Sequence, residues 1–215
     1  MQIEPFAVEQ WMNAYEDHCQ FNLAETCVES LTVEALLDLA GVGRAALDDI
    51  LAMKLTYGAI VGSERLRTAI AALYDDVAIE NVLVTHGAIG ANKLVHETLV
   101  EPNDRVISVQ PTYQQHYSIP ASYGADVQVL TLREADGYQP DLDQMRSLAT
   151  AETSLIAINN PNNPTGALMD AATLTEIGHI AASCNAHVLC DEVYRGTDQV
   201  GSGSSASIVE VYDRG

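Results

Sequence analysis

From residue 81 to residue 193, short runs of aliphatic and β-branched residues alternate with longer amphipathic runs. The expected strands are residues 81–85, 105–109, 127–132, 154–159 and 186–193. The expected helices between them are residues 88–100, 114–124, 142–149 and 170–184. Strands joined by helical crossovers pair in parallel, because a tight hairpin joins only antiparallel neighbours. The alternation therefore predicts an α/β fold in which a mostly parallel sheet carries helices on both faces.

The first third of the chain lacks this alternation and is expected to be helical. The segments with helical periodicity are residues 32–40, 44–53 and 63–77. Thr32 and Ser63 precede two of them and are expected to be N-caps, since a hydroxyl oxygen can accept from an unpaired N–H of the first turn. We expect an N-terminal helical segment over residues 1–50 and a large domain over residues 51–215.

The acidic composition disfavours two classes of partner. The formal net charge is −20, with 30 Asp and Glu residues against 10 Lys and Arg residues. Such a surface repels nucleic acid and anionic membranes, so we expect neither as a partner. No apolar run approaches the roughly 20 residues of a membrane span, and we expect a cytoplasmic protein. No metal site is expected, because the cysteines and the histidines, His86 and His96 included, lack metal-ligand spacing.

In an open parallel sheet, ligands bind outside the carboxyl ends of the strands, so the residues after each expected strand form the candidate site. "HGAIG" (86–90) opens a helix with glycines and unpaired N–H groups, which suits a phosphate. It is neither the G-x-G-x-x-G nor the Walker pattern of nucleotide sites. "QPTY" places Tyr113 at the same edge, and "DEVY" places Asp191 and Tyr194 there.

The stretch "NNPNNPTG" (159–166) follows the strand expected at residues 154–159. Proline lacks a backbone donor and fixes φ, and each residue before a proline is kept out of the helical region. Asparagine amides bond either the backbone or a ligand. The stretch is therefore expected to be a stiff polar turn, which either holds a ligand or only ends the strand.

The order of these motifs resembles the class I and II aminotransferases, the fold type I enzymes that use pyridoxal 5′-phosphate. The motifs that carry the resemblance are "Y-G-x-x-x-G…L-R" (57–67), "T-x-G-A" (85–88), "P-x-Y" (111–113), "N-P-x-N-P-T-G" (160–166) and "D-E-V-Y" (191–194). Together they cover roughly residues 50–195. The resemblance implies the large domain of that family, pyridoxal 5′-phosphate as cofactor, and an amino acid and a 2-oxo acid as substrates.

The resemblance also implies a role for each residue that would face the cofactor ring. Asp191 would face the pyridine nitrogen and keep it protonated, so that the ring withdraws electrons from the substrate. Asn163 and Tyr194 would bond the 3-oxygen of the ring, and Tyr113 would stack on its face. Considered singly, Asp191 is also compatible with a plain turn residue and Tyr113 with a half-buried aromatic.

Further residues of the family's site concern the phosphate. Gly87, Ala88 and Ile89 would give it backbone N–H groups at the start of a helix. Tyr57 would reach the phosphate of the neighbouring subunit, which implies a homodimer with shared sites or a larger assembly. Tyr57 is equally compatible with a structural role.

The chain departs from the family at the residue that attaches the cofactor. The family's catalytic lysine follows the Asp motif inside an "S-x-S-K" stretch, whereas the two lysines here, Lys54 and Lys93, precede Asp191. We therefore expect a fragment truncated before the catalytic lysine. Such a fragment has no catalytic residue of its own and is expected to be inactive alone.

Two alternatives stay open. A lyase or synthase on the same scaffold would use the same electron-withdrawing ring. A non-catalytic cofactor-binding or interaction module would need no lysine. Near the N-terminus, Glu25 is either a residue that binds a cationic group of the substrate or a surface carboxylate.

Overall fold

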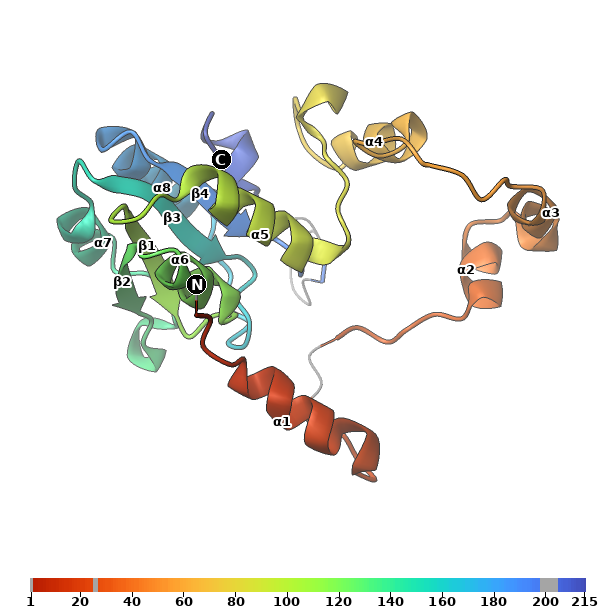
Figure 1. Ribbon diagram of the computed structural model, residues 1–215, viewed down its shortest axis with the longest axis horizontal. Coiled ribbons are helices and arrows are strands. Elements are labelled where there is room, and N and C mark those ends of the chain that lie inside the picture. The colour runs from red at the N-terminus through yellow and green to blue at the C-terminus, as the bar shows by residue number, and fades with distance from the viewer. Residues whose placement is uncertain (1, 25–26, 198–204) are drawn as a thin grey trace.

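A parallel four-stranded sheet forms the centre of the computed structural model, which describes residues 2–24, 27–197 and 205–215. The strands are β1 (Arg105–Gln110), β2 (Asp126–Thr131), β3 (Thr153–Asn159) and β4 (His187–Asp191), in the order β2-β1-β3-β4 (Figure 1). Each neighbouring pair is parallel. The α/β fold with a parallel sheet and helices at the N-terminus is therefore confirmed.

Helices cover both faces of the sheet. They are α5 (Gly87–Leu99), α6 (Gln115–Ser122), α7 (Leu142–Leu148) and α8 (Ala171–Ser183). Successive side chains of a strand point to opposite faces. Accordingly, Ile156 and Ile158 join the larger core with α7 and α8, whereas Leu155 joins the smaller core with α5. All three are fully buried, as expected for a sheet that is covered on both sides.

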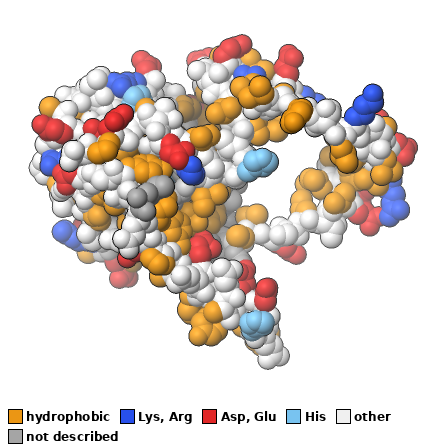
Figure 2. Space-filling view, in the orientation of Figure 1, with side chains coloured by type: hydrophobic (Ala, Val, Ile, Leu, Met, Phe, Trp, Pro, Cys, Tyr) orange, Lys and Arg blue, Asp and Glu red, His pale blue; other side chains and the backbone are white. Residues whose placement is uncertain are grey.

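In the described residues before α5 the structure has the helices α1 (Ala7–Tyr15), α2 (Val33–Leu39), α3 (Ala46–Leu51) and α4 (Glu64–Ala71). Short 3-10 turns lie at Glu16–His18, Gly43–Ala45, Ile79–Asn81, Glu134–Asp136 and Ile208–Glu210. We call residues 27–71 the N-terminal arm, since α2 and α3 lie away from the sheet (Figure 1). Neither α2 nor α3 has a buried residue, and apolar side chains are visible along the arm (Figure 2).

Side-chain caps set where several helices begin. The expected caps are confirmed: Thr32 accepts from the N–H of Ala35, and Ser63 accepts from the N–H of Leu66. Asp170 caps α8 in the same way. Each cap satisfies an N–H that has no partner within its own helix.

The strand expected at residues 81–85 is not formed. Residues 82–85 have no strand assignment, and the sheet ends at β4. The Val82 carbonyl accepts from Arg67 Nε at 2.8 Å, and the Val84 N–H donates to the Val61 carbonyl at 3.1 Å. Two of the backbone groups that could pair with a neighbouring strand therefore bond the arm instead.

Two expected helices have different ends from those the sequence pattern suggests. The helix expected at residues 63–77 ends at Ala71, where i→i+3 hydrogen bonds tighten the backbone before Asp76 takes a positive φ of 59°. The helix expected at residues 114–124 includes Pro120 and ends two residues after it. Proline lacks the N–H that would bond the carbonyl four residues earlier and crowds that carbonyl, so a helix does not continue far beyond it.

None of the helices in the described ranges combines the length and apolar character that a bilayer crossing needs.

A buried and an exposed leucine allow a matched test of how much the core contributes to the free energy of unfolding. Leu174 on α8 is 0% exposed, whereas Leu94 on α5 is 44% exposed, and both are helical leucines. Leu174→Ala should lower the free energy of unfolding by about 2–5 kcal/mol, because it removes buried methyl groups and leaves a cavity. Leu94→Ala should cost less than about 1 kcal/mol. Urea unfolding of both variants measures this, and similar losses for the two would contradict the assigned core.

Candidate active site

The register between β3 and β4 places Asn159 opposite Asp191 at the carboxyl ends of the strands. Asn159 Nδ2 donates to the Asp191 carbonyl at 2.7 Å, and the backbone N–H of Asn160 donates to the same oxygen at 2.9 Å. Asn159 Oδ1 accepts from the N–H of Asn163 at 2.6 Å. One asparagine side chain therefore joins the end of β4 to the turn that carries Asn163.

The other asparagines hold the turn itself. Asn160 exchanges two hydrogen bonds with the backbone of Met169, at 3.2 and 2.8 Å. Asn162 Nδ2 donates to Thr165 Oγ1 at 2.8 Å and to the Pro111 carbonyl at 3.2 Å. The turn is thus bonded within itself and to the end of β1, so Asn163 is fixed by its surroundings.

Asp191 is a buried carboxylate, with 7% of its side chain exposed. Asn92 Nδ2 donates to Asp191 Oδ2 at 2.8 Å, and the N–H of Val193 donates to Oδ1 at 3.1 Å. His116 Nε2 approaches Oδ2 to 3.4 Å without forming a hydrogen bond. Burial by itself raises the pKa of Asp191, but the side chains of His116 and Asn92 hold that pKa below its ordinary value. The carboxylate is therefore ionised at neutral pH.

The start of α5 has the form of an anion site. Gly87 takes a positive φ of 73°, which glycine adopts without strain, and no side chain caps the helix. Ala88 and Ile89 follow in the exposed first turn. The unpaired N–H groups of such a turn and the positive end of the helix dipole favour a negatively charged ligand.

Tyr113 lies close to the same strand ends. Its hydroxyl donates to Glu9 Oε1 at 3.0 Å, and its ring meets Phe6 edge to face, with centroids 5.8 Å apart. Burial, together with the hydrogen bond to Glu9, raises the pKa of Tyr113 to about 12. The segment that leads into α1 therefore packs on this tyrosine.

The two other expected tyrosines differ in where they lie. Tyr194 is half-buried, three residues after Asp191, and its carbonyl accepts from the backbone and side chain of Thr197. Tyr57 is 100% exposed, in the N-terminal arm between α3 and α4. This chain by itself does not bring Tyr57 to the other residues.

Reasoning from the sequence missed three buried polar residues near Asp191: Asn92 and His116, which contact its carboxylate, and Gln115, which bonds Asn92. Two signals pointed to them. Asn92 lies four residues after Ala88 on the same face of α5, and "QQH" begins directly after the "PTY" motif. Buried amides and imidazoles need partners, so their concentration beside a motif marks a site.

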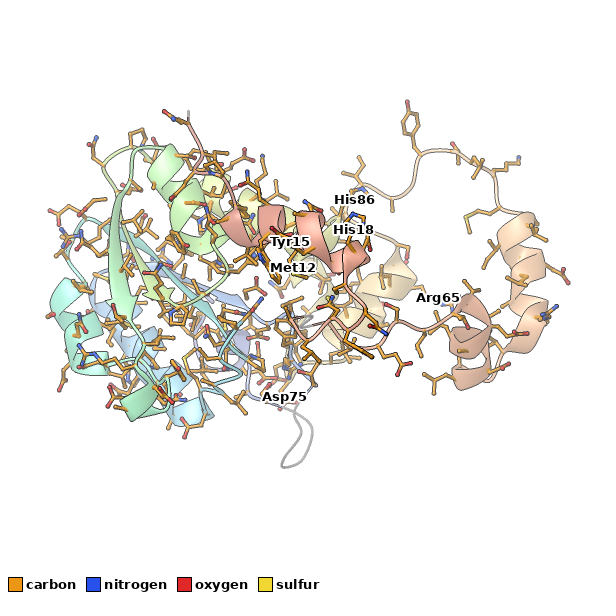
Figure 3. The ribbon with its side chains drawn as sticks, turned by 90° about the horizontal axis from the view of Figure 1, so that it is seen from below. Met12, Tyr15, His18, Arg65, Asp75 and His86 are labelled. Atoms are coloured by element: carbon orange, nitrogen blue, oxygen red, sulfur yellow. The ribbon has the colours of Figure 1, made fainter. Side chains whose placement is uncertain are left out.

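The lysines and histidines of the sequence lie elsewhere. Lys93 is on the exposed side of α5 and pairs with Glu97, and Lys54 is exposed in the arm. His86 lies exposed just before α5 (Figure 3). His96, in contrast, is buried and lies more than two turns after the start of α5. Among the residues that the structure describes, no three metal-ligating side chains gather. Glu25 lies outside the described residues.

The comparisons with known proteins agree with this geometry. Residues 35–211 match the family model of aminotransferase class I and II, so the chain belongs to that family. It is 31% identical over 189 residues to capreomycidine synthase from Streptomyces vinaceus, covering 87% of this chain and 48% of that protein. The chain therefore spans about half the length of this relative.

Two solved structures have the same arrangement. A PLP-dependent aminotransferase from Streptococcus suis 89-1591 is 42% identical, with a TM-score of 0.94, and the match covers all of this chain and 57% of that one. The PLP-dependent cyclase OrfR is 27% identical, with a TM-score of 0.78, and the match covers 88% of this chain and 49% of that one. Pyridoxal phosphate is the cofactor of this family.

The residues present fit that cofactor. An ionised carboxylate stabilises the proton on a pyridine nitrogen, and Asp191 is buried, hydrogen-bonded and ionised. A phosphate requires N–H donors, and the uncapped first turn of α5 provides them. Asn92 on α5 bonds Asp191, so the two features belong to one site.

His96 is a separate electrostatic feature of this region. It is fully buried on α5, and its ring centroid lies 6.3 Å from that of His116. Burial, assisted by the neighbouring His116, lowers the pKa of His96 to about 4. The native state therefore keeps a neutral imidazole at pH values where an unfolded chain would bind a proton.

His96 should make stability fall with acidification. Since the folded pKa lies below the unfolded value of about 6.5, the unfolded state binds more protons, and the loss runs from about pH 6.5 down to about pH 4. The total is of order 3 kcal/mol. Urea unfolding at a series of pH values should show a flatter profile for His96→Leu than for wild type. The exposed His179→Leu is the control, and parallel profiles for wild type and His96→Leu would refute the assignment.

Proposed function

We propose that the chain forms the cofactor-binding part of a pyridoxal phosphate-dependent enzyme that transfers an amino group between an amino acid and a 2-oxo acid. The observation that carries this proposal is the ionised, buried Asp191 joined through Asn92 to the open N-terminal turn of α5. Membership of the aminotransferase family supports the same chemistry.

Each residue would have a defined task. Asp191 would hold a proton on the pyridine nitrogen, and the bound cofactor would then supply an electron-withdrawing ring. The N–H groups of Gly87, Ala88 and Ile89 would bind the phosphate. Because the amide of Asn159 fixes the backbone of Asn163, the Asn163 side chain would reach the ring's 3-oxygen already oriented.

Two tyrosines would complete the contacts to the ring. Tyr194, three residues after Asp191, would bond the same 3-oxygen as Asn163. Tyr113 would lie against the face of the ring, and its raised pKa means that it would do so as a neutral phenol. Neither Lys54 nor Lys93 lies at this site, so this chain would hold the cofactor without a covalent bond.

A cyclase or another synthase on the same scaffold is the second candidate. Its support is the similarity to capreomycidine synthase over 87% of this chain, together with the cyclase structure at a TM-score of 0.78. Both candidates use the same electron-withdrawing ring, so they share the predicted cofactor site. A chain that binds no cofactor would instead be an interaction module.

The cofactor site is tested by binding rather than by turnover. Pyridoxamine 5′-phosphate has the ring nitrogen and the phosphate but needs no lysine. It should bind wild type, and Asp191→Asn should weaken binding by about tenfold or more, because a charge-assisted bond to the ring nitrogen is lost. Asp143→Asn, at an exposed aspartate on α7, is the control. Calorimetry measures both variants, and no binding to wild type would reject the proposal.

We propose, further, that two copies of the chain assemble in the cytoplasm. The N-terminal arm supports this, because Leu51, Leu55 and Ile60 are exposed along it beside Tyr57. An exposed apolar patch of this kind marks an interaction surface. An arm that crosses to a second copy would bring Tyr57 to the phosphate of the other site.

Assembly should depend on the arm and on salt. At physiological salt, where charge repulsion is screened within about 8 Å, sedimentation should give at least twice the chain mass of 23.1 kDa. Very low salt should weaken the assembly, because the net charge of −20 then acts over a longer range. Leu51→Glu should also weaken it, whereas Leu168→Glu, outside the arm, should not. A compact monomer at physiological salt would contradict the proposal.

A further inference from the structure

Two buried amides stand between the start of α5 and the carboxylate at the end of β4. Asn92 on α5 is 4% exposed, and Gln115 at the start of α6 is 2% exposed. An amide removed from water is destabilising unless its donors and acceptors find partners. The hydrogen bonds of Asn92 and Gln115 therefore indicate which groups these side chains keep in place.

The contacts form a continuous path. Gln115 Nε2 donates to the carbonyl of Ile89, in the first turn of α5, at 2.8 Å. Asn92 Nδ2 donates both to Gln115 Oε1 at 3.2 Å and to Asp191 Oδ2 at 2.8 Å. The path therefore runs from the first turn of α5 through both amides to Asp191.

The chemistry of the partners fixes the direction of each bond. An ionised carboxylate only accepts hydrogen bonds, so the NH₂ end of Asn92 must face Asp191. The second N–H of that group then points to the oxygen of Gln115, which leaves the NH₂ end of Gln115 for the Ile89 carbonyl. Reversing either amide would place two acceptors against each other.

The path connects the start of helix α5 to strand β4, and its first part runs alongside the helix. Asn92 lies five residues after Gly87, about 7.5 Å along the helix axis at 1.5 Å per residue. Asp191, in contrast, comes from β4, 99 residues further along the chain than Asn92. Without Asn92, the position of the carboxylate relative to α5 would depend on packing alone.

We propose that Asn92 and Gln115 are positioning residues that set the distance between the Asp191 carboxylate and the N-terminal turn of α5. This inference rests on the proposed function, in which one ligand places its ring nitrogen at Asp191 and its phosphate at α5. The two amides hold both ends of the site in register before the ligand arrives, which favours binding.

The groups that face Asp191 limit how the inference is tested. His116 of α6 lies 3.4 Å from Oδ2, and the N–H of Val193 bonds Oδ1. Neither of these contacts involves the Asn92 side chain. A change at Asn92 therefore reports on one bond to the carboxylate, and the remaining partners keep the fold of the strand end.

The first measurement needs no cofactor. In wild type, the carboxyl carbon of Asp191 is followed by NMR as the pH is lowered, with Asp191→Asn identifying its signal. Asn92→Leu should move the midpoint upward, because a hydrogen bond to the ionised form is lost. Asn92→Asp should move it further, since two adjacent carboxylates repel. An unchanged midpoint in both variants would overturn the inference, whatever the cofactor result.

The second measurement uses pyridoxamine 5′-phosphate as the probe. Asn92→Leu should weaken binding by about tenfold to a hundredfold, the loss expected for one hydrogen bond to a charged group. Gln115→Met should weaken it in the same direction, whereas Gln114→Met is the matched control, because Gln114 bonds the carbonyls of Glu4 and Pro5 instead. Equal affinities for wild type, Asn92→Leu and Gln115→Met would overturn the positioning role.

The outcomes separate this inference from the proposed function. If wild type does not bind the probe but the Asp191 midpoint moves in Asn92→Leu, the proposed function fails and the link between Asn92 and Asp191 stands. If wild type binds the probe and neither variant changes anything, the positioning role fails and the proposed function stands. Should Asn92→Leu not fold, Asn92→Asp, which has nearly the same shape, replaces it in both measurements.

Discussion

The parallel register of β3 against β4 is the constraint on which the site depends. Because Asn159 lies opposite Asp191, the asparagine side chain reaches both the end of β4 and the backbone of Asn163. A slip of one residue would turn every side chain of the strand to the opposite face and separate these groups. Strand β3, which is buried except at the half-buried Ser154, fixes that register, since its side chains are divided between two cores.

The carboxylate of Asp191 explains why polar residues collect in an otherwise apolar region. Burying a charge is costly unless hydrogen bonds and compensating charge replace water. Asn92 comes from α5, His116 from α6 and the Val193 N–H from the loop after β4. Three separate elements therefore converge on one side chain. A group held in this way stays ionised and oriented, as a site that binds a ring nitrogen requires.

The sheet and the N-terminal arm differ in how much of their apolar surface is buried. The sheet is enclosed by helices, whereas α2 and α3 have no buried residue and expose leucines along the arm. At the edge of the sheet, the Val188 N–H of β4 donates to the Arg214 carbonyl at 3.0 Å, so the C-terminal segment covers part of that edge. Exposed apolar arms and partly covered edges favour association, while the acidic surface keeps copies apart.

The sequence by itself determined the features that depend on neighbours along the chain. Hydrophobic periodicity predicted the four strands of the sheet and the helices between them, and the hydroxyls of Thr32 and Ser63 predicted where two helices begin. Only the tertiary structure decided two other features. Residues 82–85 have strand-like composition, yet the Val82 carbonyl and the Val84 N–H bond the arm instead of another strand. Asn92 and Gln115 meet Asp191 only when α5, α6 and β4 pack together, because contacts over such separations leave no periodic signal in the sequence.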